Sequence, residues 1–338
     1  MKLRNGLAAT ALAATAVIAL ASCSAPAADD DSAGTDDTAS ATSVSTMFGE
    51  VEIPAADDGD LTVVALGWSD AEMALALDVV PVAVFDWQGF GAENKGVGPW
   101  ATDLFGDVDP EIIERGDESL NYEQILTLEP DLILNTRSGN DEAEFERLSE
   151  IAPTVYGPEG TGAYATEWTD QLTLVGEALG KADEATELVD DVESQISEAA
   201  EANPEFEGLS TASVSKFGDA YGAYLPGDGR FDILADLGLV NNEPIDELEN
   251  SGFYAAVSAE NVSVFDADTA VILPIGFTLD EAEGDPLLSS LNVVADDRAV
   301  FIDPDSDLSG AWGASSVLSI PVVLDELVPQ LADAAGRL

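Results

Sequence analysis

The chain has 338 residues, of which 67 are Asp or Glu, 11 are Lys or Arg and none is His, so its formal net charge is −56. A surface this acidic repels phosphate groups, which argues against nucleic acid and anionic lipid headgroups as partners. Without His there is no His-based zinc site and no Ser-His-Asp triad, and a single Cys excludes disulfide scaffolds. A hydrophobic content of 46% is enough for one large or two ordinary globular domains.

The first residues have the pattern of a secretory leader. Two bases precede an apolar run over residues 7–20, which is short for a membrane span of about 20 apolar residues, and Leu-Ala-Ser-Cys follows at 20–23. This ending resembles a bacterial lipobox, which implies a lipoprotein signal peptide over 1–22 and lipidation of Cys23, with palmitate among the attached chains. The alternative is an ordinary signal peptide with an incidental Cys. Cleavage would remove two bases and no acid, bringing the net charge from −56 to −58.

The segment behind this leader, residues 23–46, contains Ala, Ser, Thr and Asp and almost no large apolar side chain. Such a segment cannot bury enough surface to offset the entropy lost on ordering, so we expect a disordered linker. The mature protein would then be extracytoplasmic and anchored to the cell membrane through its N-terminal lipid only.

Strand-like runs alternate with helical patterns in the rest of the chain. The runs are short and mostly apolar, as in parallel strands that are buried on both faces. Repeated strand–helix units of this kind predict mostly parallel sheets covered by helices. The expected strands are 61–66, 80–85, 131–135, 211–216, 269–273 and 299–302.

One long amphipathic segment separates the two series of strands. Apolar residues recur at intervals of three and four from Lys181 to about Asn203, and Pro204 marks the end of the helix. A helix of this length spans about 33 Å, the width of a small domain. We therefore predict an α/β fold of two Rossmann-like lobes joined by one backbone helix. The predicted boundaries are an N-terminal lobe over 47–180, the helix over 181–203 and a C-terminal lobe over 204–338.

Aromatic residues follow several of the predicted strands. Ligands of open α/β sheets bind beyond the carboxyl ends of the strands, so these residues predict an interlobe cleft with aromatic walls, although each alone also fits core packing. Arg137 follows a central strand, and its planar fork suits carboxylate or hydroxamate oxygens. The candidate ligand-binding residues are Trp68, Trp87, Trp100, Arg137, Tyr221, Tyr224, Phe277 and Trp312.

Several segments carry a family resemblance, which covers the chain from about residue 52 to 338. It resembles the substrate-binding lipoproteins of ABC importers for ferric siderophores, haem and cobalamin, and Gly-Val-Gly-Pro-Trp at 96–100 looks like the siderophore-binding members of actinobacteria. The matching segments are Val-Val-Ala-Leu-Gly-Trp at 63–68, Leu-Asp-Val-Val-Pro-Val-Ala-Val at 77–84, Leu-Asn-Tyr-Glu-Gln-Ile-Leu-Thr-Leu-Glu-Pro-Asp-Leu-Ile-Leu at 120–134, Leu-Val-Gly-Glu-Ala-Leu-Gly-Lys-Ala at 174–182 and Ala-Trp-Gly-Ala-Ser-Ser-Val-Leu-Ser-Ile-Pro at 311–321.

The resemblance implies a two-lobed, non-catalytic receptor that captures a ferric siderophore in an interlobe cleft and delivers it to an ABC importer permease with its ATPase. It implies docking on the permease through Glu123 and Glu260, one residue in each lobe. Iron would be bound only through the siderophore, so no cofactor, protein metal site or catalytic residue is expected. The acidity of the chain favours neutral or cationic hydroxamate complexes, and we expect a monomer.

Two alternatives stay open at this point. A haem- or cobalamin-binding importer component would share the fold, with Tyr available as a haem ligand in place of His. A lipid-anchored α/β envelope enzyme is the rival from another class, and the chain contains neither a Gly-x-Ser-x-Gly elbow nor a Walker loop.

Overall fold

A computed structural model describes residues 41–55, 61–113, 120–250 and 252–338. The predicted signal peptide, the lipidation site Cys23 and most of the predicted linker lie outside these ranges. The end of the linker prediction is wrong, because Thr42–Thr46 forms strand β1, which pairs antiparallel with β2 (Gly49–Ile53). The Thr and Val side chains of β1 favour extended backbone, and Val44, its one large apolar residue, is fully buried.

The first sheet has five parallel strands in the order β5-β4-β3-β6-β7. Its three longer strands are buried along their whole length, as their continuous apolar sequences predict. The strands are β3 (Val63–Ala65), β4 (Ala83–Val84), β5 (Glu111–Ile112), β6 (Leu132–Asn135) and β7 (Thr154–Tyr156). The accompanying helices are α1 (Asp70–Ala76), η1 (Ala92–Asn94), α2 (Pro99–Thr102), η2 (Asp103–Phe105), α3 (Tyr122–Thr127), α4 (Glu142–Ser149) and α5 (Trp168–Ala178).

The second sheet is mixed, with the order β11-β9-β8-β12-β13 and β10 beside β8. Strands β8, β10, β12 and β13 pair in parallel, whereas β9 pairs antiparallel with both β8 and β11. The strands are β8 (Ser210–Phe217), β9 (Ala220–Tyr224), β10 (Val240–Asn241), β11 (Tyr254–Val257), β12 (Thr269–Ile275) and β13 (Ala299–Phe301). The helices are η3 (Pro204–Phe206), α7 (Gly229–Asp236), α8 (Glu243–Asp246), η4 (Ala259–Phe265), α9 (Leu279–Glu283), η5 (Leu288–Ser290), α10 (Asn292–Ala295), α11 (Asp307–Ala314) and α12 (Ile320–Ala335).

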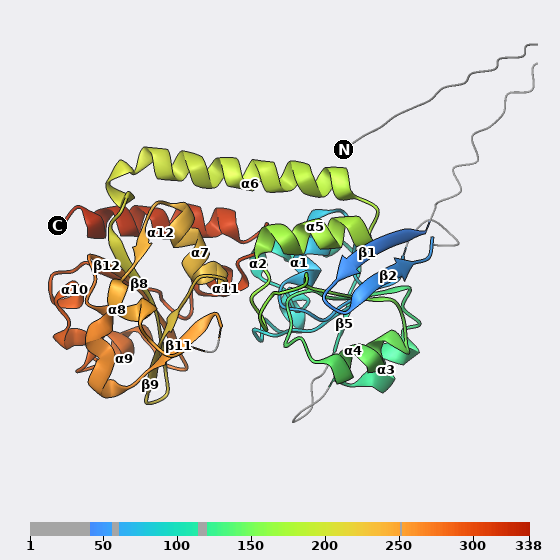
Figure 1. Cartoon of the computed structure of the whole chain (residues 1–338), viewed down its shortest axis with the longest axis horizontal. Coiled ribbons are helices and arrows are strands. Elements are labelled where there is room, and N and C mark those ends of the chain that lie inside the picture. Colours follow the sequence, from blue (N-terminus) through green and yellow to red (C-terminus); the bar gives the residue numbers. More distant parts are fainter. Residues whose placement is uncertain (1–40, 56–60, 114–119, 251) are drawn as a thin grey trace, which may run out of the picture. The chain divides into compact units, whose positions relative to one another are not determined.

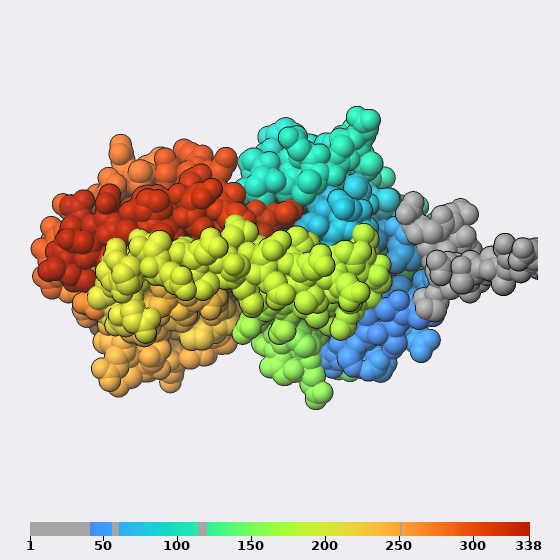
Figure 2. Space-filling model, turned by 90° about the horizontal axis from the view of Figure 1, so that it is seen from above, coloured from blue at the N-terminus to red at the C-terminus, as the bar shows by residue number. Residues whose placement is uncertain are grey.

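The predicted backbone helix is confirmed as α6 (Ala182–Ala202), which connects the elements around the first sheet, the first lobe, with those around the second sheet, the second lobe. Its buried residues Ala185, Val192 and Ile196 lie on one face, as the spacing predicts. Figure 1 shows α6 running along both lobes, and Figure 2 shows it side by side with α12. The fold class is therefore the predicted one, two α/β lobes joined by one long helix.

One apolar core runs through both lobes. Leu132 of the first sheet and Val271 of the second sheet belong to the same cluster of buried side chains, which also contains Ile196 of α6. Consistent with this shared core, the described residues from 41 onward form one compact unit, and the predicted lobe boundaries stay a prediction. The cluster includes Trp312, which is 0% exposed. The prediction that Trp312 contacts a ligand is therefore wrong, because its ring is used entirely for packing.

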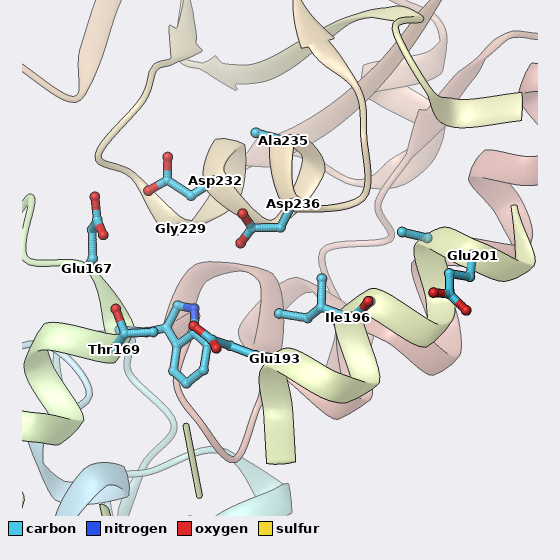
Figure 3. A pocket seen from close by; sticks show the side chains of 12 residues that line it. Glu167, Thr169, Glu193, Ile196, Glu201, Gly229, Asp232, Ala235 and Asp236 are labelled. Atoms are coloured by element: carbon cyan, nitrogen blue, oxygen red, sulfur yellow. The ribbon is translucent and has the colours of Figure 1, made fainter. Parts of the chain in front are cut away.

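A cavity of about 490 Å³ lies where α5, α6 and α7 meet. Figure 3 shows Asp232 turned toward Glu167 and Asp236 turned toward Glu193, and none of the 12 residues that line the cavity is a base. Burial, together with the negative charges of Asp228 and Glu167, raises the pKa of Asp232 to about 7. The cavity therefore places like charges from both lobes and from α6 opposite one another.

Replacing Trp312 by Ala tests the shared core. We expect the substitution to lower the free energy of unfolding by about 3–5 kcal/mol, as for other large core side chains, with a single unfolding transition for both lobes. Phe217→Ala, at a site that is 60% exposed, is the matched control and should change the free energy of unfolding by less than about 0.5 kcal/mol. Chemical denaturation of both variants measures this, and two separate transitions would contradict a common core.

The acidic cavity predicts how stability depends on pH. Folded Asp232 retains its proton up to about pH 7, whereas the unfolded chain releases it near pH 4, so the wild-type protein should lose stability as the pH rises between these values. Asp232→Asn should remove this loss and be more stable than wild type at pH 8, by on the order of 1 kcal/mol after solvent screening. Thermal unfolding from pH 4 to pH 8 measures it. The control Asp325→Asn removes the same charge at an exposed site, and an equal gain there would refute a specific role of Asp232.

Candidate functional site

Three of the predicted ligand-binding residues meet beyond the carboxyl ends of the first sheet. Trp68 follows β3, Trp87 follows β4 and Arg137 follows β6. The rings of Trp68 and Trp87 are stacked, with centroids 4.3 Å apart and an interplanar angle of 10°. The guanidinium carbon of Arg137 lies 5.8 Å from the Trp68 ring centroid. Adjacent parallel strands end at the same edge of a sheet, which is why residues far apart in sequence meet here.

Tyr164 joins this group, although it was not among the predicted residues. Its ring stacks on Trp68 at a centroid distance of 4.3 Å. The backbone of Tyr164 donates its N–H to the Ser138 carbonyl at 2.7 Å and accepts Nε–H of Arg137 at 3.2 Å, which fixes the ring beside the strand ends. The signal that could have identified it is the Gly-rich loop after β7, at the same sheet edge.

A pocket of about 120 Å³ lies between these side chains. Two buried polar atoms of its lining residues, Nη2 of Arg137 and Oγ of Ser138, have no hydrogen-bond partner among the described residues. Arg137 is 2% exposed and Ser138 is 5% exposed. Because buried polar atoms in native proteins are nearly always hydrogen-bonded, these two atoms are candidates for a bond to a ligand or to water. Its lining residues are Leu66, Trp68, Phe85, Trp87, Asn135, Arg137, Ser138 and Tyr164.

Asp70 at the start of α1 holds the strand ends in place. Its buried carboxylate accepts the backbone N–H of Gly67 at 3.0 Å and that of Thr136 at 2.9 Å, the residues that directly precede Trp68 and Arg137. The Gln171 side chain donates to the same carboxylate at 2.7 Å. Burial raises the pKa of Asp70, while these hydrogen bonds oppose the rise. The separation of Trp68 and Arg137 is thus fixed by one carboxylate.

Arg137 also bridges the two lobes. Its Nη1 donates to the carbonyl of Ala314 at the end of α11, at 3.1 Å, and its Nη2 lies 3.9 Å from the Asp228 carboxylate. Asp228 is held more closely by Arg230, whose Nε and Nη2 donate to it at 2.7 and 2.6 Å. Burial opposes ionisation of Asp228, but the charges of Arg230 and Arg137 hold its pKa below the usual range.

Trp100 belongs to a different contact between the lobes. Its indole N–H donates to the buried carboxylate of Glu72 at 2.9 Å, and the hydroxyl of Ser316 donates to the same carboxylate. The ring packs edge to face against Phe90 and lines a separate pocket of about 280 Å³ with Gln88, Phe90 and residues near 304–310. Trp100 therefore lies apart from the pocket of Trp68 and Arg137.

The predicted residues of the second lobe do not join the pocket of the first lobe. Tyr221 is 4% exposed and donates its hydroxyl to Asp285. The ammonium group of Lys216 lies 4.3 Å from the ring centroid of Tyr221 and 5.0 Å from that of Phe277. Tyr224 is 3% exposed and covers the guanidinium of Arg230 at 3.8 Å. Both rings are engaged in these contacts within the second lobe, and the predicted ligand contacts of Tyr221 and Tyr224 stay a prediction. The prediction for Phe277 stays open.

Phe253 is the second-lobe residue that faces the stacked rings. Its ring centroid lies 6.5 Å from that of Tyr164 and 6.5 Å from that of Tyr254, which in turn neighbours Tyr224. Phe253 directly precedes β11, the end strand of the second sheet. The second lobe thus contributes the residue before β11 to this aromatic group, whereas the prediction placed the residues that follow its strands there.

The two predicted docking residues occupy equivalent positions. Glu123 on α3 and Glu260 on η4 are both exposed and precede an Asp at the same sequence spacing. Asp131 accepts the backbone N–H of Thr62 at 2.8 Å, and Asp268 accepts that of Ser210 at 3.0 Å.

Within the described ranges, no helix is long and apolar enough to cross a membrane, and no cluster of three or more His, Cys, Asp or Glu side chains could hold a metal ion.

Comparisons with known proteins give matches of the same architecture. A periplasmic solute-binding protein from Mycobacterium smegmatis is 32% identical, with a TM-score of 0.75, over 88% of this chain and 99% of that chain. PiaA from Streptococcus pneumoniae in complex with ferrichrome is 26% identical, with a TM-score of 0.74, over 88% of this chain and 99% of that chain.

A curated relative is similar over a shorter region. The probable siderophore-binding lipoprotein YfiY from Bacillus subtilis is 32% identical over 137 residues, which are 40% of this chain and 38% of YfiY. The chain thus spans less than half the length of this curated relative. Residues 63–305 match the sequence profile of the family described as periplasmic binding protein. The chain therefore belongs to the periplasmic binding protein family.

Proposed function

We propose that this protein is an extracytoplasmic receptor that binds a ferric siderophore, of the hydroxamate type, and delivers it to the permease of an ABC importer. The observation that carries the proposal is the stack of Trp68, Trp87 and Tyr164 at the lobe junction, beside Arg137, whose Nη2 has no hydrogen-bond partner among the described residues. The names of YfiY, a siderophore-binding lipoprotein, and of PiaA with ferrichrome support the ligand class.

Binding in this site needs no bond making or breaking. The aromatic rings offer rigid apolar surface, and Arg137 offers a charged donor to ligand oxygens. Iron stays coordinated by the siderophore, so the protein acts as a receptor without cofactor or catalytic residue. The resemblance also supports lipidation at Cys23, attachment to the membrane through this lipid alone, and action as a monomer that serves a permease coupled to an ATPase.

The shared core limits how far the two lobes can move when the receptor binds its ligand. Arg137, Ser69 and Glu72 of the first lobe are hydrogen-bonded to residues 314–316 of the second lobe. Large hinge motions would break these bonds and divide the core. The permease would therefore distinguish loaded from empty receptor by small shifts and altered populations.

Quenching of tryptophan fluorescence tests ligand class. Ferrioxamine B should quench the fluorescence with saturable binding, and ferric enterobactin, which is strongly anionic, should bind at least about tenfold more weakly because the chain is so acidic. Trp68→Phe should reduce the quenching, and Trp168→Phe, on the face of the acidic cavity, is the matched control. Tighter binding of ferric enterobactin would refute the hydroxamate assignment.

Charge reversal tests the docking surface. Glu123→Lys together with Glu260→Lys should abolish uptake of radioactive iron from ferrioxamine B by cells, while the dissociation constant measured on the purified protein stays within about twofold. The matched control reverses two other exposed acids, Glu142→Lys and Glu247→Lys, and should leave uptake largely intact. Loss of ligand affinity in the first pair would show that these residues are not docking residues.

A further inference from the structure

The acidic cavity where α5, α6 and α7 meet is large enough to hold a whole small molecule. Its volume of about 490 Å³ lies within the range of about 300–1,000 Å³ that is typical of small-molecule sites. It is separate from the candidate functional site, because the two cavities share no lining residue. The proposed receptor function therefore does not account for it.

The carboxylates of this cavity form two facing pairs. Asp232 is turned toward Glu167, the residue before α5, and Asp236 is turned toward Glu193 of α6 (Figure 3). Asp232 and Asp236 lie one turn apart on α7, which places their Cβ atoms about 5–6 Å from each other. No lining residue is a base, and Arg137 acts on Asp232 only from beyond ion-pair distance. Each pair thus carries negative charge that the cavity itself does not neutralise.

The arrangement suits an extended organic cation better than a metal ion. In the part of the chain that the structure describes, no three carboxylates lie close enough together to hold a metal. Burial and the neighbouring carboxylates raise the pKa of both Asp232 and Asp236, because repulsion within the cavity opposes their ionisation. Two positive charges about one helical turn apart would relieve this repulsion at both pairs.

Trp168 gives an observation that is independent of the carboxylates. It lines the cavity although it is only 7% exposed, and its indole N–H has no hydrogen-bond partner among the described residues. A buried polar group without a partner in the protein marks a position that a ligand or water completes. Indole rings also attract organic cations more strongly than other aromatic rings do. Ile196, which is 4% exposed, adds apolar surface for an alkyl chain.

We propose that the acidic cavity binds a linear organic diamine. One ammonium group lies between Asp232 and Glu167, and its N–H groups donate charge-assisted hydrogen bonds to both carboxylates. The other lies between Asp236 and Glu193, and the methylene chain packs on Trp168. This site goes beyond the proposed receptor function and does not depend on it. Because the cavity joins both lobes to α6, the bound diamine also stabilises the folded protein.

Isothermal titration of the full-length chain with 1,4-diaminobutane tests the proposal. In about 0.15 M sodium chloride, which screens the general attraction of an acidic surface for cations, we expect saturable binding of one diamine per chain. The monoamine 1-aminobutane should bind at least about tenfold more weakly, because it can neutralise only one carboxylate pair. Magnesium chloride supplies the same charge without the alkyl chain and should give no saturable binding.

A double substitution assigns the binding to the cavity. Asp236→Asn with Glu193→Gln, both at exposed positions, should weaken binding of 1,4-diaminobutane at least about tenfold and reduce the rise in unfolding temperature that the diamine causes in wild type. The matched control, Asp325→Asn with Glu326→Gln, removes two charges from exposed positions of α12 and should leave the affinity within about twofold. Ferrioxamine B should bind both variants as it binds wild type.

Three results would overturn the diamine site. They are the absence of saturable binding by the diamine, equally tight binding of magnesium, and an equal loss of affinity in the control pair on α12. The last two would show that the cation is attracted by the acidic surface as a whole. Each of these results leaves the receptor for ferric siderophores standing, because ferrioxamine B is measured separately on the same proteins.

Discussion

Apolar side chains of β3 and β6 in the first lobe, of β12 and β13 in the second and of α6 between them pack into one buried cluster. Dividing the lobes would expose this cluster to water, which costs roughly 25 cal/mol for each Å² of apolar surface. The packing therefore holds the two sheets in one arrangement. Trp312, with no exposed surface, lies within this cluster, and so the C-terminal part of the chain is part of the same structure.

The candidate site depends on this rigidity. Asp70 ties the ends of β3 and β6, and Arg137 reaches from the first lobe to the Ala314 carbonyl in the second. The donors and rings are thus positioned before a ligand arrives, which reduces the entropy lost on binding. The acidic cavity at α5, α6 and α7 is less suited to a carboxylate, since its walls carry several carboxylates and none of its lining residues is a base.

The sequence predicted the parts of the structure that follow from periodicity. The apolar spacing of residues 181–203 identified α6, and the apolar runs identified the buried parallel strands. The rule that ligands bind beyond the carboxyl ends of the strands predicted that Trp68, Trp87 and Arg137 lie together. It did not foresee that Tyr221 and Tyr224 lie on β9, which runs antiparallel to β8, because strand order and direction are long-range properties that local sequence does not contain. The burial of Trp312 could not be predicted from the sequence either, because the residues around it fit a loop as well as a core helix.

A crystal structure of the protein with ferrioxamine B, compared with the free protein, tests the central claim most directly. The common core and the bonds at residues 314–316 predict that the iron complex lies against Trp68, Trp87 and Phe253 while the two sheets keep their relative position within small shifts. A complex bound in the α5–α6–α7 cavity would contradict this explanation. So would a hinge rotation that separates β6 and β12 into two independent cores.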